Sequence, residues 1–92
     1  MRERVVSISN TLGLHARAAA KVVRLAQTFQ SNVTLTRSDT GIIADGKDIL
    51  SVLQIAAGRG INLTISAEGP DEQDAIEQIV KLFGDKFGED QD

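Results

Sequence analysis

The chain has 92 residues, with 13 acidic and 10 basic side chains for a net charge of −3, three aromatic residues and no cysteine. This balance argues against general nucleic-acid binding, which needs clustered Lys and Arg with aromatic rings for base stacking. Disulfides and thiolate zinc sites are excluded, and no apolar run approaches the roughly 20 residues that span a bilayer. We therefore expect a single cytoplasmic, globular domain over residues 1–92 without membrane insertion.

The first half of the chain predicts a strand, a helix and a hairpin. Alternation over residues 4–8 indicates the first strand. A helix is expected over residues 16–29, because its apolar side chains recur at steps of three and four. Residues 33–36 and 42–44 read as two strands joined by a turn at residues 38–41, which is typical of a β-hairpin.

The second half predicts a short helix, a strand and a final helix. Asp48 precedes an apolar run that indicates a helix ended by Gly58 or Gly60, with Val52 and Ala56 expected in the core. Residues 61–66 alternate most clearly as a strand. Asp71 is expected to cap the last helix, and residues 88–92 are expected to fray. The buried stripe of that helix is predicted to contain Ala75, Ile76, Ile79, Val80, Phe83 and Phe87.

The element order is β-α-β-β-α-β-α, with strands that are amphipathic rather than uniformly apolar. This pattern predicts an α+β fold with an antiparallel sheet covered by helices on one face, a two-layer open-faced sandwich. A ferredoxin-like arrangement shares the first six elements. The pattern alone leaves both arrangements open.

The only histidine, His15, stands where the first helix is expected to begin. The first amides of a helix are unpaired and carry about half a positive charge, so the amides near Ala16 and Ala18 are expected to bind phosphate oxygens. Arg17 adds a guanidinium suited to a phosphoryl group. Gly13 lets the loop bend so that the ring stays at the surface.

These positive surroundings disfavour the imidazolium, so we expect the pKa of His15 to be lowered. A neutral imidazole attacks phosphorus without a separate base. The alternative is a surface or capping histidine beside a solvated face of cations formed by Arg17, Lys21 and Arg24. No Walker loop, catalytic carboxylate pair or metal-ligand cluster appears in the sequence, so we expect a stoichiometric phosphocarrier rather than a free-standing enzyme, with no cofactor and no metal.

Three segments carry a resemblance to a known family. Residues 13–17 (Gly-Leu-His-Ala-Arg, followed by alanines), 47–53 and 60–69 resemble the HPr family, the histidine-containing phosphocarriers of the phosphoenolpyruvate:sugar phosphotransferase system. The resemblance covers nearly the whole chain. It implies a four-stranded antiparallel sheet with three helices on one face, in agreement with the predicted element order.

The resemblance also implies roles for individual residues. His15 would be phosphorylated on Nδ1 by phosphorylated enzyme I and would pass the group to a IIA-type domain, while Arg17 steadies the phosphohistidine. An exposed apolar patch would dock both partners, with core packing as its alternative role; its members are Ile49, Leu50 and Leu53. Lys21 and Arg24 would contact acidic partner surfaces. The protein would act as a monomer.

Two positions depart from the family pattern. Ala18 stands where the family usually has proline. The alanine adds an amide donor and gives up the fixed φ of proline. Asp48 stands where many relatives have a regulatory serine, and it either imitates phosphoserine in part or simply caps a helix. The last helix, including Phe87 to Asp90, resembles nitrogen-related paralogues that serve regulatory relays rather than sugar uptake. Other hypotheses are a ferredoxin-like module for a small ligand and an adaptor that binds regulatory proteins without phosphotransfer.

Overall fold

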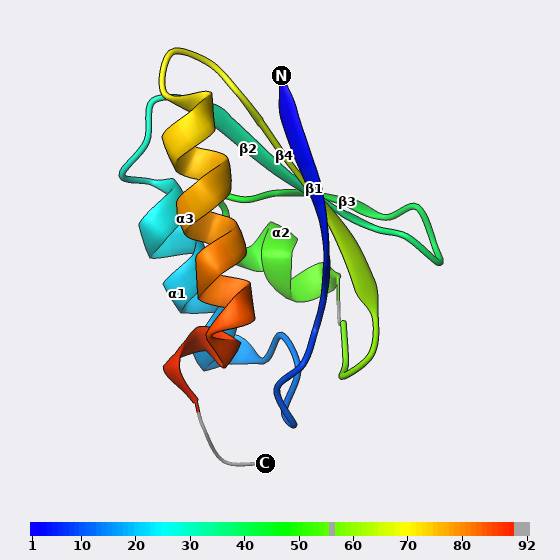
Figure 1. The fold of residues 1–92 in the computed structure, drawn as a ribbon. Helices are drawn as coiled ribbons and strands as arrows, with labels where there is room; N and C mark the ends of the chain where they lie inside the picture. The colour runs from blue at the N-terminus through cyan, green and yellow to red at the C-terminus, as the bar shows by residue number, and fades with distance from the viewer. Residues whose placement is uncertain (56, 90–92) are drawn as a thin grey trace.

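The computed structural model describes residues 1–55 and 57–89 and shows an antiparallel sheet with helices packed on one face (Figure 1). The four strands lie in the order β1-β4-β2-β3. Their bounds are β1 Arg2–Ser7, β2 Asn32–Arg37, β3 Ile43–Asp45 and β4 Asn62–Glu68. The helices are α1 Ala16–Ala26, α2 Ile49–Gln54 and α3 Glu72–Gly84, followed by a short 3-10 turn, η1 Lys86–Gly88. The predicted open-faced sandwich is confirmed. The ferredoxin-like alternative is wrong, because it places the first strand inside the sheet and β1 lies at an edge.

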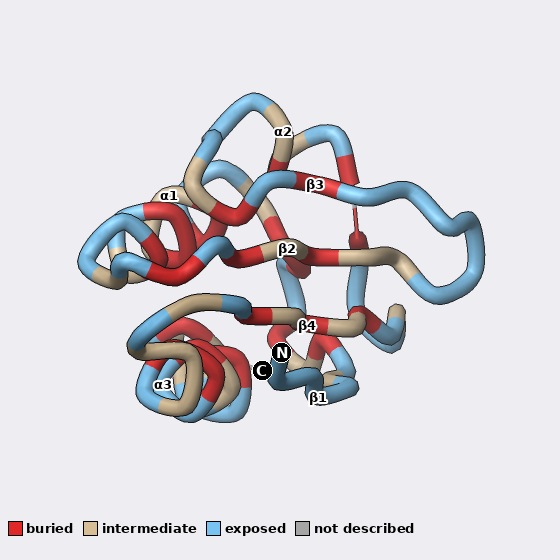
Figure 2. Tube along the Cα trace, turned by 90° about the horizontal axis from the view of Figure 1, so that it is seen from above, coloured by how far each residue is buried: buried red, intermediate tan, exposed pale blue. Residues whose placement is uncertain are grey.

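The strand register explains which side chains enter the core. Leu35 pairs with Ile65 across β2 and β4, and all of their surface is buried. The neighbouring pair, Thr36 and Thr64, points to the outer face and is half-buried. Side chains directly opposite one another in an antiparallel pair share a face, so the period of two seen in the sequence sorts apolar groups toward the helices. Figure 2 shows this alternation along β2 and β4.

The predicted helical stripes form the other half of the core. Ala18, Ala19, Val22 and Ala26 of α1 are buried, as are Ala75, Ile76, Ile79 and Phe83 of α3. Val80 and Leu25 are only half-buried and pack against this cluster. In α2 the expected core residue Val52 is fully buried. Ala56, the other core residue expected there, lies outside the described residues.

Helix α1 ends at Ala26, three residues before the predicted end. The amides of Thr28 and Phe29 donate to the carbonyls three residues earlier, Leu25 and Ala26. Such bonds tighten the last turn of a helix and satisfy carbonyls that would otherwise lack partners. The chain therefore leaves the helical path before Phe29, whose side chain still packs on the core.

Asp71 stands at the N-cap of α3 as predicted, but its side chain does not cap that helix. Its carboxylate instead accepts hydrogen bonds from the amides of Gln30 and Ser31, both at 2.9 Å, and from the Ser31 hydroxyl at 2.5 Å. The Ser31 hydroxyl bond and these amide bonds hold the pKa of Asp71 below its usual value. Asp71 therefore fastens the start of α3 to the turn that joins α1 to β2.

We expect Asp71→Asn to lower the free energy of unfolding at neutral pH. Because the folded-state pKa is lowered, this contribution is present above the ordinary aspartate value of about 3.9 and is lost as the pH falls through the folded value. Denaturant unfolding from pH 7 to pH 2 should show the gap between wild type and variant closing with acid. Asp74→Asn, an exposed carboxylate in the first turn of the same helix, is the matched control. A gap that stays constant with pH would contradict the assignment.

Candidate functional site

His15 occupies the N-cap of α1 with extended backbone angles, φ −79° and ψ −179°. Its carbonyl accepts the amide of Ala19 at 2.8 Å, but its side chain makes no capping hydrogen bond. The first turn also contains no acidic residue, so no carboxylate within that turn offsets the positive end of the helix dipole. The side chain of His15 is 25% exposed. The ring is thus at the surface and beside the helix start, as predicted, although three-quarters of it is covered.

The loop before His15 is held by backbone contacts to the segment that follows α2. Gly13 has a φ of +68°, and a Cβ there would lie 2.7 Å from the Ala57 carbonyl oxygen and 2.9 Å from the Gly58 Cα. The next amide, Leu14 N, donates to that same Ala57 oxygen at 2.9 Å. Only glycine fits a backbone approach this close. Gly13 therefore sets the distance between the His15 loop and residues 57 and 58, which follow α2.

We expect Gly13→Ala to destabilise the protein by more than the cost of a left-handed alanine alone, which is about 1–2 kcal/mol. Gly41→Ala is the matched control, because Gly41 has a similar φ of +77° but has nothing within 4 Å of the added Cβ. Denaturant unfolding of both variants separates backbone strain from the close approach. Equal losses in the two variants would show that the contact with residues 57 and 58 contributes nothing.

A carboxylate that the sequence did not suggest lies against the ring. Glu89 Oε2 is 2.5 Å from His15 Nε2, and Glu89 Oε1 accepts a hydrogen bond from Asn10 Nδ2 at 3.0 Å. Asn10 is 1% exposed and also donates to the Gly13 carbonyl at 2.9 Å. The expectation that residues 88–92 fray is wrong for Glu89, because these bonds hold it, while residues 90–92 lie outside the described part. No pattern in the sequence links Glu89 to a histidine 74 positions earlier.

The segment that carries Glu89 is held by the buried side chain of Phe87 and by a hydrogen bond from Lys21. Phe87 is 1% exposed and meets Phe83 edge-on, with ring centroids 4.9 Å apart. Lys21 Nζ donates to the Phe87 carbonyl at 2.5 Å. Lys86 and Phe87 have φ values of +55° and +58°, which cost about 1–2 kcal/mol each for residues with a Cβ. Burial of a Phe side chain is worth about 1.5–3 kcal/mol and offsets much of this strain.

The charges around the ring are therefore mixed rather than uniformly positive as expected. Burial acts to raise the pKa of Glu89, but the hydrogen bonds from His15 and Asn10 and the charges of His15 and Lys21 outweigh it and lower the pKa. Glu89 is thus ionised at neutral pH and accepts the bond, so Nε2 of His15 carries the proton. The remaining ring nitrogen, Nδ1, keeps its lone pair when the imidazole is neutral.

Of the three cations predicted to share an exposed face, the structure leaves two exposed. Arg17 and Arg24 are exposed, whereas Lys21 is half-buried against the C-terminal segment. Arg17 lines a hollow of about 130 Å³ together with Thr11, Leu12 and Glu89. Ala16 is exposed, and the Ala18 side chain is buried in the core. The hollow places a guanidinium and a carboxylate beside the His15 loop.

The apolar residues of α2 divide between surface and core. Leu50 is 69% exposed and Ile49 is 36% exposed, while Leu53 is half-buried and packs on the core. The Leu50 amide donates to Asp48 Oδ1 at 3.0 Å, which confirms the capping interpretation of Asp48. We use the name α2 patch for Ile49, Leu50 and Leu53. The Leu14–Ala57 bond holds the segment that follows this helix beside the His15 loop.

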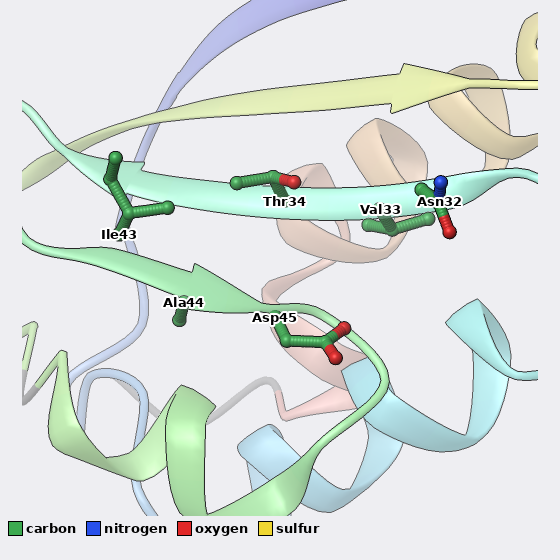
Figure 3. Close-up of a pocket in the computed structure, with 6 residues that line it drawn as sticks. All are labelled: Asn32, Val33, Thr34, Ile43, Ala44 and Asp45. Carbon is green, nitrogen blue, oxygen red and sulfur yellow. The ribbon is translucent and has the colours of Figure 1, made fainter.

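A larger hollow of about 370 Å³ lies along β2 and β3 (Figure 3). Its walls are formed by Asn32, Val33, Thr34, Ile43, Ala44 and Asp45. It contains no histidine and no cation, so size alone does not identify the reactive site. Across residues 1–55 and 57–89, no group of three metal-ligating side chains is present, and no helix is long and apolar enough to cross a membrane.

Comparison with known proteins agrees with this geometry. A family model described as "PTS HPr component phosphorylation site" matches residues 2–85. The phosphocarrier protein HPr of Cupriavidus necator is 44% identical over 89 residues, covering 97% of this chain and 98% of that protein. The phosphocarrier protein NPr of Proteus mirabilis is 42% identical over 87 residues, covering 95% and 96%. The crystal structure of HPr-C-His from Thermoanaerobacter tengcongensis has a TM-score of 0.92 at 35% identity, covering 99% and 100%.

The fold, with a histidine at the start of its first helix, defines a small α+β phosphocarrier. The chain belongs to the HPr family and is a phosphocarrier of the phosphotransferase system. Proteins of this family interact with enzyme I and with IIA-type domains.

Proposed function

We propose that His15 is the residue that carries the phosphoryl group, on Nδ1, between phosphorylated enzyme I and a IIA-type domain. The observation that supports this most is the position of His15 at the N-cap of α1 without a capping bond from its side chain. The ring lies next to unpaired helix amides, and its Nε2 is already engaged by Glu89. Nδ1 is then the nitrogen available to attack phosphorus.

The transfer itself needs no general base. The Nδ1 lone pair forms the N–P bond as the bond from phosphorus to its donor breaks, and the donor keeps that electron pair. The first-turn amides from Ala16 to Ala18 and the Arg17 guanidinium would hold the phosphoryl oxygens. Each dipole contact of this exposed kind is worth about 0.3–1 kcal/mol. Such weak holding suits a carrier, because every 1.4 kcal/mol or so of excess affinity would cost a factor of ten in onward transfer.

The α2 patch would dock both partners. Leu50 and Ile49 are exposed apolar side chains on a helix held beside the His15 loop, and clustered exposed apolar groups mark protein interaction sites. Arg24 is exposed about two turns along α1 from Arg17 and would speed encounter with an acidic partner surface. Lys21 donates to the Phe87 carbonyl, which holds its side chain in place. Its charge would add to that of Arg24 in attracting an acidic partner.

The two departures from the family pattern have separate consequences. Ala18 supplies an amide that proline would lack, so we propose that transfer survives the change. Asp48 removes the hydroxyl on which a regulatory kinase would act, so we propose that this switch is absent. That Asp48 also imitates phosphoserine stays a prediction.

The IIA-type domain that accepts the phosphoryl group determines whether the protein serves sugar uptake or a nitrogen-related relay. Relatives named HPr and NPr have similar identity to this chain, 44% and 42%. We propose that the acceptor serves sugar uptake or a nitrogen-related regulatory relay, with the C-terminal resemblance favouring the second. Comparing transfer rates to IIA domains of both kinds from the source organism distinguishes the branches.

Incubation with radiolabelled phosphoenolpyruvate and a matched enzyme I should label the wild-type chain on His15. The product should be stable to base and labile to acid, as expected for a phosphoramidate, and His15→Ala should lose the label completely. Ser51→Ala is the control and should be labelled like wild type. Label on a serine, or none with an active enzyme I, would refute the proposal.

Leu50→Glu should weaken binding to enzyme I about tenfold or more, because burying a charge at an apolar contact is costly. Ile43→Glu is the matched control, since Ile43 is equally exposed at 67% but lies on the outer face of the sheet. Isothermal calorimetry with enzyme I measures both affinities. An equal loss in both variants would show that the α2 patch has no special role.

A further inference from the structure

We infer that Glu89 is a positioning residue for phosphoryl transfer, because its carboxylate holds the Nε2–H of His15 and so directs the lone pair of the ring to Nδ1. This inference rests on the proposed function of His15. It adds a role for Glu89, which lies 74 residues from His15 in sequence and reaches the ring through its side chain.

The carboxylate is held from two sides. Oε2 lies 2.5 Å from His15 Nε2, and Oε1 accepts from Asn10 Nδ2 at 3.0 Å. Asn10 is itself fixed by its burial and by a second bond to the Gly13 carbonyl. A carboxylate with both oxygens engaged has a defined orientation, and an oriented acceptor selects one tautomer of a neutral histidine.

The backbone that presents Glu89 is also held in place. Phe87 is buried against Phe83, and Lys21 binds the Phe87 carbonyl. Three successive residues, 86 to 88, have positive φ values. Left-handed backbone at residues with a Cβ persists only where the surroundings determine it. Here the packing of Phe87 on Phe83 and the hydrogen bond from Lys21 hold this backbone. The Glu89 carboxylate is thereby placed against the ring of His15.

The same contact assists both directions of transfer. When Nδ1 attacks phosphorus, positive charge develops on the ring, and the Glu89 carboxylate stabilises it through Nε2–H as an aspartate stabilises a catalytic imidazolium. When the acceptor nucleophile attacks the phosphohistidine, the N–P bond breaks and its electron pair returns to Nδ1. Because Nε2 has kept its proton, the leaving group is neutral imidazole and no proton has to move.

The negative charge of Glu89 does not block the phosphoryl group. The two ring nitrogens point away from each other, so a group on Nδ1 and a carboxylate on Nε2 lie on opposite sides of the imidazole. The amide end of α1 and Arg17 supply positive charge for the phosphoryl oxygens. The attraction between the Glu89 carboxylate and the ring therefore acts over a shorter distance than the repulsion between this carboxylate and the phosphoryl group.

The first test reads the tautomer in the full, unphosphorylated chain by ¹⁵N NMR of His15. Wild type should hold the Nε2–H form. Glu89→Ala should raise the fraction of the Nδ1–H form about tenfold, the change expected from losing one charge-assisted hydrogen bond. Glu68→Ala removes an exposed carboxylate at the end of β4 and should leave the tautomer unchanged. An unchanged tautomer in Glu89→Ala overturns the inference.

The second test measures phosphoryl transfer from enzyme I to His15 for the same variants. Glu89→Ala should slow the transfer about tenfold while its unfolding midpoint shows that it remains folded. Glu89→Gln offers one acceptor oxygen for two donors and should fall between. A shifted tautomer with unchanged transfer overturns the role in transfer. If wild-type His15 accepts no phosphoryl group at all, the proposed function fails instead, and the NMR result still reports whether Glu89 orients the ring.

Discussion

The close backbone approach between Gly13 and residues 57 and 58 is the constraint on which the site depends. Because Gly13 adopts a left-handed conformation, the loop after β1 lies against residues 57 and 58. The Leu14 amide donates a hydrogen bond to the Ala57 carbonyl in the same contact. This contact holds the loop that leads to His15 beside the segment that follows α2. The α2 region is also held by the Asp45 amide, which donates to Ser51 Oγ at 2.9 Å, and by Arg37, which donates to the Ile55 carbonyl at 2.9 Å.

The electrostatics of the site combine a cationic helix end with one anionic side chain. The first turn of α1 has no acid, so its amides and Arg17 remain available to an anion. Glu89 lines the same hollow as Arg17 and accepts a hydrogen bond from His15 Nε2. A carrier has to gain and lose its cargo with little net change in free energy. Weak, exposed contacts to the phosphoryl oxygens meet that requirement, together with an imidazole that Glu89 orients and whose Nδ1 keeps its lone pair.

Asp71 and Lys21 show how charged side chains are reused to join segments. Asp71 stands at the start of α3 but binds the turn between α1 and β2, and Lys21 extends from α1 to the carbonyl of Phe87. Both join segments that are remote in sequence. A local rule assigns the first to a helix cap and the second to a solvated face, because local rules contain no information about which distant backbone groups lack partners.

The sequence by itself determined the element order, the inward faces of the strands and helices, and the placement of His15 beside a helix start. These follow from periods of two and 3.6 and from short-range signals such as Asp48, whose carboxylate accepts the amide of Leu50 two residues later. Only the tertiary structure decided that β1 lies at an edge, that Lys21 is tied down and that Glu89 and Asn10 meet at the ring. The place of β1 depends on its pairing with β4, and the contacts of Lys21 and Glu89 depend on how Phe87 packs against Phe83. No local pattern encodes a contact between residues 15 and 89.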